Sequence, residues 1–196
     1  MSSLENKGLN AKDLINVGIY TALYLVVFFV VGLLTAIPVI YPFLFVIWPV
    51  MTGIPFMLYT TKIKKPGMLI ISAMILSVAW FLMGYPWYVF ITYFIFGLAS
   101  EFAFKAANYQ NFKMILVGYW LFSCGCIGVQ LPIWLMDGYL DGVEEMMGSQ
   151  YANQLATFMP DWLMFGAFGL IFIGAVIGAM LGKKMLRKHF ERAGIA

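Results

Sequence analysis

Long apolar runs, separated by short polar segments, recur from one end of this sequence to the other. A helix that crosses the hydrocarbon layer of a bilayer needs about 20 mainly apolar residues. Of the 196 residues, 63% are hydrophobic and 11% are charged, whereas soluble domains average about 45–50% apolar and about 25% charged residues. A soluble core of this size cannot bury so much apolar surface. We therefore predict an all-α integral membrane protein that forms a single domain, residues 1–196.

The apolar runs predict six transmembrane helices. They cover about residues 14–36, 39–59, 68–83, 87–104, 114–136 and 160–181, and they leave one long acidic outer loop at 137–159. Asn10, followed by Asp13 in the first turn, predicts a capped start for the first helix. The second run contains several prolines, which predict a kinked or partly broken helix; they are Pro38, Pro42, Pro49 and Pro55.

The positions of lysine and arginine predict that both termini lie inside, because cytoplasmic loops carry an excess of these residues. With this orientation the inner segments contain all 12 basic residues of the chain, and the outer segments contain none. The outer segments carry acidic residues instead: Asp137, Asp141, Glu144, Glu145 and Asp161. A wrong number of spans would lose this asymmetry, so the six spans and the orientation support each other.

The spans contain almost none of the ionisable side chains that membrane enzymes keep at membrane depth. The sequence has no Walker-type glycine loop, no HExxH motif and no Cys/His cluster. We therefore expect no enzyme, no cofactor, no metal site and no nucleic-acid partner. Cys124 and Cys126 are predicted to be packing residues, because side chains two positions apart on a helix point to nearly opposite sides. Glu101 and Lys105 are predicted to form an interfacial ion pair.

Polar and aromatic side chains gather towards the outer ends of spans three to six. Gln130, Trp134 and Asp137 follow the spacing i, i+4 and i+7 and share one face of the fifth helix. Interfacial belts of tryptophan and tyrosine explain part of this pattern, but an amide at the depth of Gln130 needs a partner or a ligand. The predicted substrate-binding residues are Trp80, Trp87, Tyr88, Gln130, Trp134, Asp137 and Asn153.

Small residues at four-residue spacing allow helix backbones to approach closely. Gly174, Gly178 and Gly182 form such a ladder in the sixth span, where packing within the chain is the favoured interpretation. Gly18 and Ala22 form a shorter pair in the first span. For this pair, packing within the chain and contact with another subunit both remain open.

The first span begins Lys12-Asp13-Leu14-Ile15-Asn16-Val17-Gly18-Ile19-Tyr20-Thr21-Ala22. With a lysine-bearing start, six predicted spans and a basic tail, the whole chain resembles the substrate-binding S components of energy-coupling factor (ECF) transporters. It is most similar to the MptD/Trep_Strep group. The resemblance implies the six-helix S-component bundle in a prokaryotic cytoplasmic membrane. It also implies a membrane-embedded substrate-binding subunit for ATP-driven uptake of a vitamin or related micronutrient.

The resemblance further implies two kinds of protein partner, a transmembrane coupling subunit (T component) and two ABC-type ATPases. S components typically carry an Ala-xxx-Ala pattern in the first helix that docks on the coupling subunit. Here Gly18 takes the first position and Ala22 the second, and glycine preserves the close approach. Because the outer side has no basic residue, a neutral or cationic ring compound is favoured. The alternative is a self-sufficient secondary transporter, which needs intramembrane charges or matching broken helices.

Overall fold

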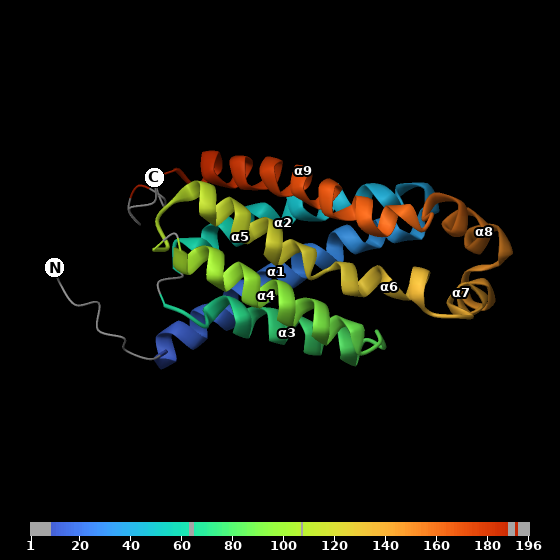
Figure 1. Ribbon diagram of the computed structural model, residues 1–196, viewed down its shortest axis with the longest axis horizontal. Helices are drawn as coiled ribbons and strands as arrows, with labels where there is room; N and C mark the ends of the chain where they lie inside the picture. The colour runs from blue at the N-terminus through green and yellow to red at the C-terminus, as the bar shows by residue number, and fades with distance from the viewer. Residues whose placement is uncertain (1–8, 63–64, 107, 188–190, 192–196) are drawn as a thin grey trace.

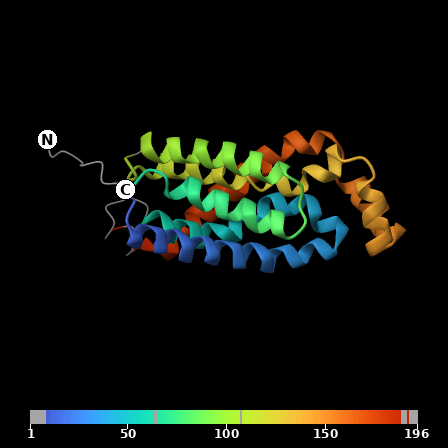
Figure 2. The same ribbon diagram turned by 90° about the horizontal axis from the view of Figure 1, so that it is seen from below.

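The structure is a computed structural model that describes residues 9–62, 65–106, 108–187 and 191. The described elements are α-helices and two short 3-10 helices: α1 (Ala11–Gly32), η1 (Leu33–Ala36), η2 (Pro38–Phe43), α2 (Leu44–Thr60), α3 (Met68–Leu82), α4 (Tyr88–Ala106), α5 (Phe112–Cys124), α6 (Ile127–Leu135), α7 (Tyr139–Met147), α8 (Ser149–Phe158) and α9 (Trp162–Met185). The long helices run along the long axis of one bundle (Figures 1 and 2). The all-helical prediction is confirmed for the described residues.

Among the described residues, four helical segments are long and apolar enough to cross a membrane: Ala11–Ala36, Pro38–Thr60, Tyr88–Ala106 and Trp162–Met185. The pair α5 and α6 makes a fifth if it is counted as one span with a 40° bend. The remaining apolar helix, α3, has 15 residues and is therefore about 22 Å long, short of the roughly 30 Å of a bilayer core. The multi-spanning character is thus present, and the number six stays a prediction.

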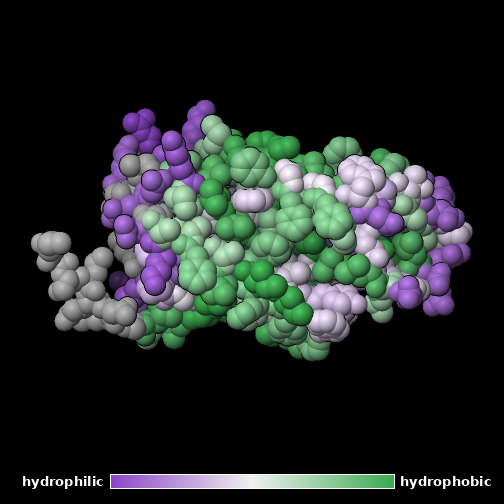
Figure 3. All heavy atoms as spheres, viewed as in Figure 1, coloured by the Kyte–Doolittle hydropathy of each residue, from purple (hydrophilic) through white to green (hydrophobic). Residues whose placement is uncertain are grey.

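The two ends of the bundle carry opposite charge. The described lysine and arginine residues lie in the first or last turns of helices, or next to them, at one end, which we call the basic end. The acidic residues Asp137, Asp141, Glu144, Glu145 and Asp161 lie at the opposite end with α7 and α8, which we call the acidic end (Figure 1). Figure 3 shows apolar side chains over the middle of one face and hydrophilic ones at both ends. This is the pattern that a bilayer-spanning bundle requires.

The predicted start of the first helix is confirmed by a capping box. The Asn10 side chain accepts a hydrogen bond from the backbone N–H of Asp13 at 3.0 Å, and the Asp13 carboxylate accepts one from the backbone N–H of Asn10 at 2.9 Å. Lys65 pairs with Asp13 at 2.7 Å and so ties the segment between α2 and α3 to α1. The proline-rich second run is irregular as expected. Its first part forms η2, and Pro49 and Pro55 lie inside α2.

Two local predictions need correction. Residues 137–159 are not one irregular loop, because they form α7 and α8. Gly138 and Gly148 separate these helices from their neighbours with φ angles of 73° and 88°, a left-handed conformation that glycine adopts without steric cost. Val143, Ala152 and Leu155 are buried and anchor the two helices on the bundle.

The second correction concerns Glu101, which does not pair with Lys105. Its carboxylate is buried and accepts hydrogen bonds from the backbone N–H of Leu69 at 3.0 Å and from the Tyr109 hydroxyl at 3.1 Å, whereas Lys105 is exposed. Leu69 lies in the first turn of α3, so the carboxylate caps that helix. Its negative charge interacts favourably with the positive end of the helix dipole. Glu101 therefore makes tertiary contacts with Leu69 and Tyr109 in place of the predicted i, i+4 ion pair with Lys105.

The glycine ladder of α9 packs against α2, as predicted. A Cβ atom built on Gly178 would overlap the carbonyl oxygen of Pro49, and one built on Gly53 would lie 2.5 Å from the carbonyl carbon of Gly178. Gly174 meets the backbone of Val46 in the same way. The two backbones are in direct contact, which only glycine permits at this distance.

The predicted orientation can be tested at two exposed positions. A cysteine introduced at Ser149 in α8 should react with an impermeant maleimide added to intact cells, and one introduced at Lys62 after α2 should not. Cys124 and Cys126 are both buried and therefore add little background. Lys64 and Lys188, also predicted to lie inside, fall outside the described residues. Labelling of the Lys62 site from outside would overturn the orientation.

Candidate functional site

A cavity of about 220 Å³ lies between the ends of α1 and α3, the 3-10 segment and α6. Its aromatic lining residues are Phe28, Phe29, Tyr41, Trp48, Trp80 and Tyr85. Val129 and Gln130 of α6 line it as well, together with Gly32, Leu33, Thr35 and Met83. Leu33 and Met83 are largely exposed. Among the described residues, no lining side chain carries a charge.

The aromatic walls are held by mutual contacts. Phe28 stacks on Trp48 with ring centroids 4.5 Å apart and an interplanar angle of 15°, and Trp80 meets Phe28 edge-on at 5.0 Å. Tyr85 contacts the same Trp80 ring edge-on at 5.4 Å. Such stacked and edge-on pairs add stability beyond burial alone. The walls are therefore ordered ring faces rather than loose side chains.

Both indole N–H groups in these walls are already used. Trp48 Nε1 donates to the carbonyl oxygen of Phe28 at 3.2 Å, and Trp80 Nε1 donates to the Tyr93 hydroxyl at 3.1 Å. These bonds fix the ring planes, and Phe28 covers one face of Trp48. Polar recognition in the cavity must therefore come from other groups.

Gln130 is the most unusual lining residue. Its side chain is buried, with only 1% of the residue exposed, yet neither Nε2 nor Oε1 has a hydrogen-bond partner among the described residues. A buried polar group without a partner costs about 1–3 kcal/mol, so such groups usually serve a function. Gly128 helps to place it, because this glycine lets α6 approach Thr92 of α4 closely. Gln130 thus brings to the cavity lining one donor and one acceptor that no described residue satisfies.

Tyrosine hydroxyls tie the α7–α8 segment to the cavity. The Tyr151 hydroxyl of α8 donates to the carbonyl oxygen of Thr35 at 2.5 Å, and Thr35 itself lines the cavity. Burial raises the pKa of Tyr85 and of Tyr151 above the ordinary value. Both hydroxyls are therefore neutral at physiological pH, and the proton of the Tyr151 hydroxyl is used in the bond to Thr35.

The structure brings together two of the seven predicted substrate-binding residues, Trp80 and Gln130. Trp87 is 59% exposed and contacts Tyr88 next to it, at a ring distance of 4.8 Å. Trp134 donates from Nε1 to the carbonyl oxygen of Met159 at 3.0 Å. The remaining two predicted residues, Asp137 and Asn153, are exposed on the acidic end. None of these five lines the cavity described above.

Sequence reasoning missed the contribution of the first two spans, namely Phe28, Tyr41 and Trp48. A signal for Trp48 was present. Tryptophan in a membrane protein favours the interface, whereas Trp48 lies well inside the second apolar run. A tryptophan that lies away from the interfacial aromatic belt in this way indicates a packed or ligand-facing position.

Gly18 and Ala22 lie on an exposed face of α1. A Cβ atom built on Gly18 would meet nothing within 4 Å. Of the two interpretations of this pair, packing against the described residues is therefore not found for Gly18. Ile15, Ile19 and Val26 are exposed on the same helix, and Figure 2 shows α1 along one edge of the bundle.

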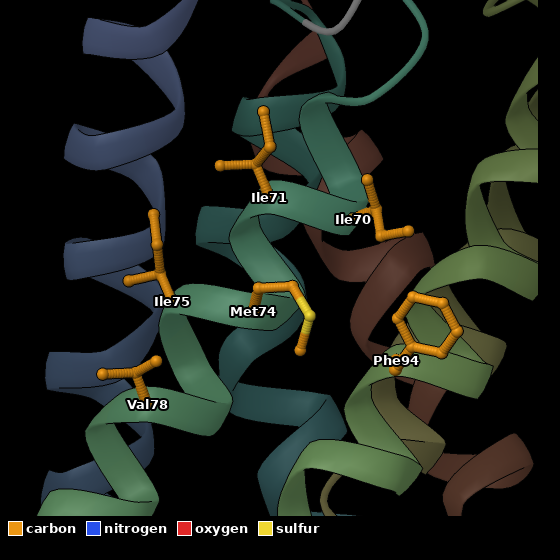
Figure 4. A pocket seen from close by; sticks show the side chains of 6 residues that line it. All are labelled: Ile70, Ile71, Met74, Ile75, Val78 and Phe94. Carbon is orange, nitrogen blue, oxygen red and sulfur yellow. The ribbon is translucent and has the colours of Figure 1, made fainter.

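A larger apolar groove of about 490 Å³ lies over α3 and is lined by Ile70, Ile71, Met74, Ile75, Val78 and Phe94. Figure 4 shows Met74 and Ile70 on the side of α3 that faces Phe94 of α4. All six side chains are apolar and offer no hydrogen bond to orient a small molecule. The groove suits acyl chains or an apolar helix, and the cavity around Gln130 is the better candidate for a small ligand.

These features define an integral membrane protein with several apolar helices and an aromatic cavity near one end. The chain belongs to the Trep_Strep family, described as hypothetical bacterial integral membrane proteins, which matches residues 11–192. Neither a curated protein nor a solved structure matches the chain.

If the Gln130 amide is unpaired without ligand, its replacement by an apolar side chain of similar size should stabilise the ligand-free protein. We expect Gln130→Leu to melt at the same temperature as the wild type or a higher one, because it removes an orphaned polar group from the interior. Thermal unfolding in detergent, followed by tryptophan fluorescence, measures this. A clearly lower melting temperature would mean that the amide has a structural partner.

Proposed function

We propose that this protein is the membrane-embedded substrate-binding component of an ATP-driven ECF-type uptake transporter for a vitamin or related micronutrient. The observation that carries the proposal is the aromatic cavity with the unpaired Gln130 amide. Pockets for small molecules combine apolar walls with a few polar groups that fix orientation. This cavity has both elements within one small space.

The position of the cavity supports a role in uptake. Its lining comes from the ends of α1 and α3 and from α6, towards the acidic end of the bundle. The distribution of basic residues predicts that this end faces outward. A substrate would then enter from outside, before any step that consumes ATP.

The exposed face of α1 supports the proposal that a partner protein binds there. Gly18 lies in the half of α1 nearer the basic end and Ala22 lies at the middle of the helix, and both are between the exposed side chains of Ile15 and Val26. Small residues on a membrane helix favour close contact with another helix, since there is little hydrophobic drive for association within lipid. The proposed partner on this face is the transmembrane coupling subunit, which would connect the protein to two ABC-type ATPases.

A self-sufficient secondary transporter is the alternative. The 40° bend between α5 and α6 is the observation that favours it, because broken helices often form the substrate sites of such transporters. Secondary transporters also use ionisable residues at membrane depth. The described lining of the cavity contains none, so we favour the ECF component.

Affinity purification separates the two functions. Tagged protein, expressed in a bacterium that carries its native coupling genes, should retain a coupling subunit and two ABC-type ATPases, identified by mass spectrometry. Uptake by that strain should require ATP hydrolysis. Uptake by the purified protein alone in proteoliposomes, driven by an ion gradient, would contradict the proposal and favour the alternative.

A further inference from the structure

The chemistry of Gln130 restricts what the cavity can bind. A carboxamide places an acceptor, Oε1, beside a donor, Nε2, in one plane. The matching partner is an edge that presents a donor and an acceptor side by side, as when glutamine or asparagine pairs with the edge of adenine. Both atoms of Gln130 are buried, and neither has a partner in the part of the chain that the structure describes. One two-point contact with a ligand would satisfy them together.

The walls restrict the shape of the ligand. Six aromatic side chains line the cavity, and the two indole N–H groups among them are engaged by Phe28 and Tyr93. The tryptophans therefore contribute aromatic surface to the lining rather than N–H donors, and aromatic surface favours flat partners through stacking. A flat ring is therefore favoured over a flexible or saturated compound.

Volume and charge restrict the ligand further. Pockets for drug-sized molecules measure roughly 300–1,000 Å³, so a cavity of about 220 Å³ suits one or two fused rings. The described lining has no charged side chain, and an ion without a partner is costly to bury. An uncharged ligand avoids this cost.

We propose that the cavity binds an uncharged, flat heteroaromatic compound of one or two fused rings whose edge pairs a hydrogen-bond donor with an adjacent acceptor, and that the Gln130 amide binds this edge. The inference rests on the proposed function, because it specifies the substrate class of the same site. Gln130 sets the specificity, and the stacked rings around Trp48 and Trp80 supply the surface for the ring.

Three small probes test the proposal on the purified full-length protein. 7-Azaindole is a flat bicyclic compound with a ring nitrogen acceptor beside an N–H donor, and indole has the same shape and the donor only. N-methylquinolinium is a flat cation without a donor. Dissociation constants are measured by ligand-observed NMR for the wild type, for Gln130→Leu and for Gln154→Leu, which makes the same chemical change on the exposed surface of α8.

We expect the wild type and Gln154→Leu to bind 7-azaindole about tenfold more tightly than indole, the gain from satisfying an orphaned amide. Gln130→Leu should bind the two compounds equally, with about the affinity of the wild type for indole. The proposal would be overturned by any of three results. The wild type shows no such preference, Gln130→Leu retains the preference, or 7-azaindole does not bind. Tighter binding of N-methylquinolinium would overturn it in favour of a cation site.

The same preparations distinguish this inference from the proposed function. Retention of the coupling subunit and ATPases is scored beside the dissociation constants. If coupling partners are retained but the probe preference is missing, the substrate class is wrong and the transport role stands. If the preference is present but no partner is retained, the transport role fails and the inferred ligand chemistry stands.

Discussion

The double substitution Gly18→Leu and Ala22→Leu is expected to abolish ATP-driven uptake while the isolated protein stays folded and binds its ligand. Both residues lie on the exposed face of α1, and Gly18 has nothing within 4 Å of a built Cβ atom. We therefore expect the isolated protein to accommodate leucine on this face, whereas leucine would force a partner helix away and remove many small dispersion contacts. The measurements are uptake in cells, pull-down of the coupling subunit and ligand affinity.

Gly18→Ala is the matched control for this prediction. It introduces the Ala-xxx-Ala pattern that S components typically carry, and it adds only one methyl group at an open position. Uptake and pull-down should remain close to wild-type values. Normal complex formation by the double leucine variant would rule out docking through this face.

Gly178→Leu is expected to prevent the protein from folding. A Cβ atom on Gly178 would already overlap the carbonyl oxygen of Pro49 and lie 3.0 Å from Val50, and α2 and α9 have no room to separate without losing the contacts of Gly53 and Gly174 as well. Even Gly178→Ala should destabilise the protein by about 1–3 kcal/mol, as overpacking of a close contact usually does. Size-exclusion chromatography of a fluorescent fusion and thermal unfolding measure both effects.

Gly169→Leu makes the same change on the same helix at a position where nothing lies within 4 Å. This variant should elute and melt as the wild type does. If Gly169→Leu and Gly178→Leu were equally harmful, the damage would come from leucine in α9 in general, and the close packing of α2 against α9 would not be its cause.

The apolar runs and the charge pattern were sufficient to predict the helical class, the capped start at Asn10 and the glycine contact of α9. These features depend on local sequence or on a repeated spacing. The α7 and α8 helices were missed because four acidic residues and three glycines within 137–159 favoured a loop. A helical spacing of buried residues, Ala152, Leu155 and Met159, was nevertheless present.

The cavity was only half predictable for a different reason. Gln130 stood out because an amide inside an apolar run is costly, and Trp80 lay near it in the predicted membrane level. Phe28 and Trp48 come from the first two spans and reach the cavity through packing of α1 against α2, which no spacing along the chain encodes. Helical periodicity grouped Trp134 with Gln130, but its Nε1–H donates to the carbonyl oxygen of Met159.

The central claim is that a ligand site at Gln130 and a coupling face at Gly18 and Ala22 are separate parts of one transport component. Mass spectrometry of small molecules released by heat from purified protein tests this claim most directly. Wild type and the Gly18→Leu, Ala22→Leu double variant, expressed in the native bacterium, should release the same small heteroaromatic compound, and Gln130→Leu should release little of it. Release of the same compound in equal amounts from all three proteins, or from none of them, would contradict the account.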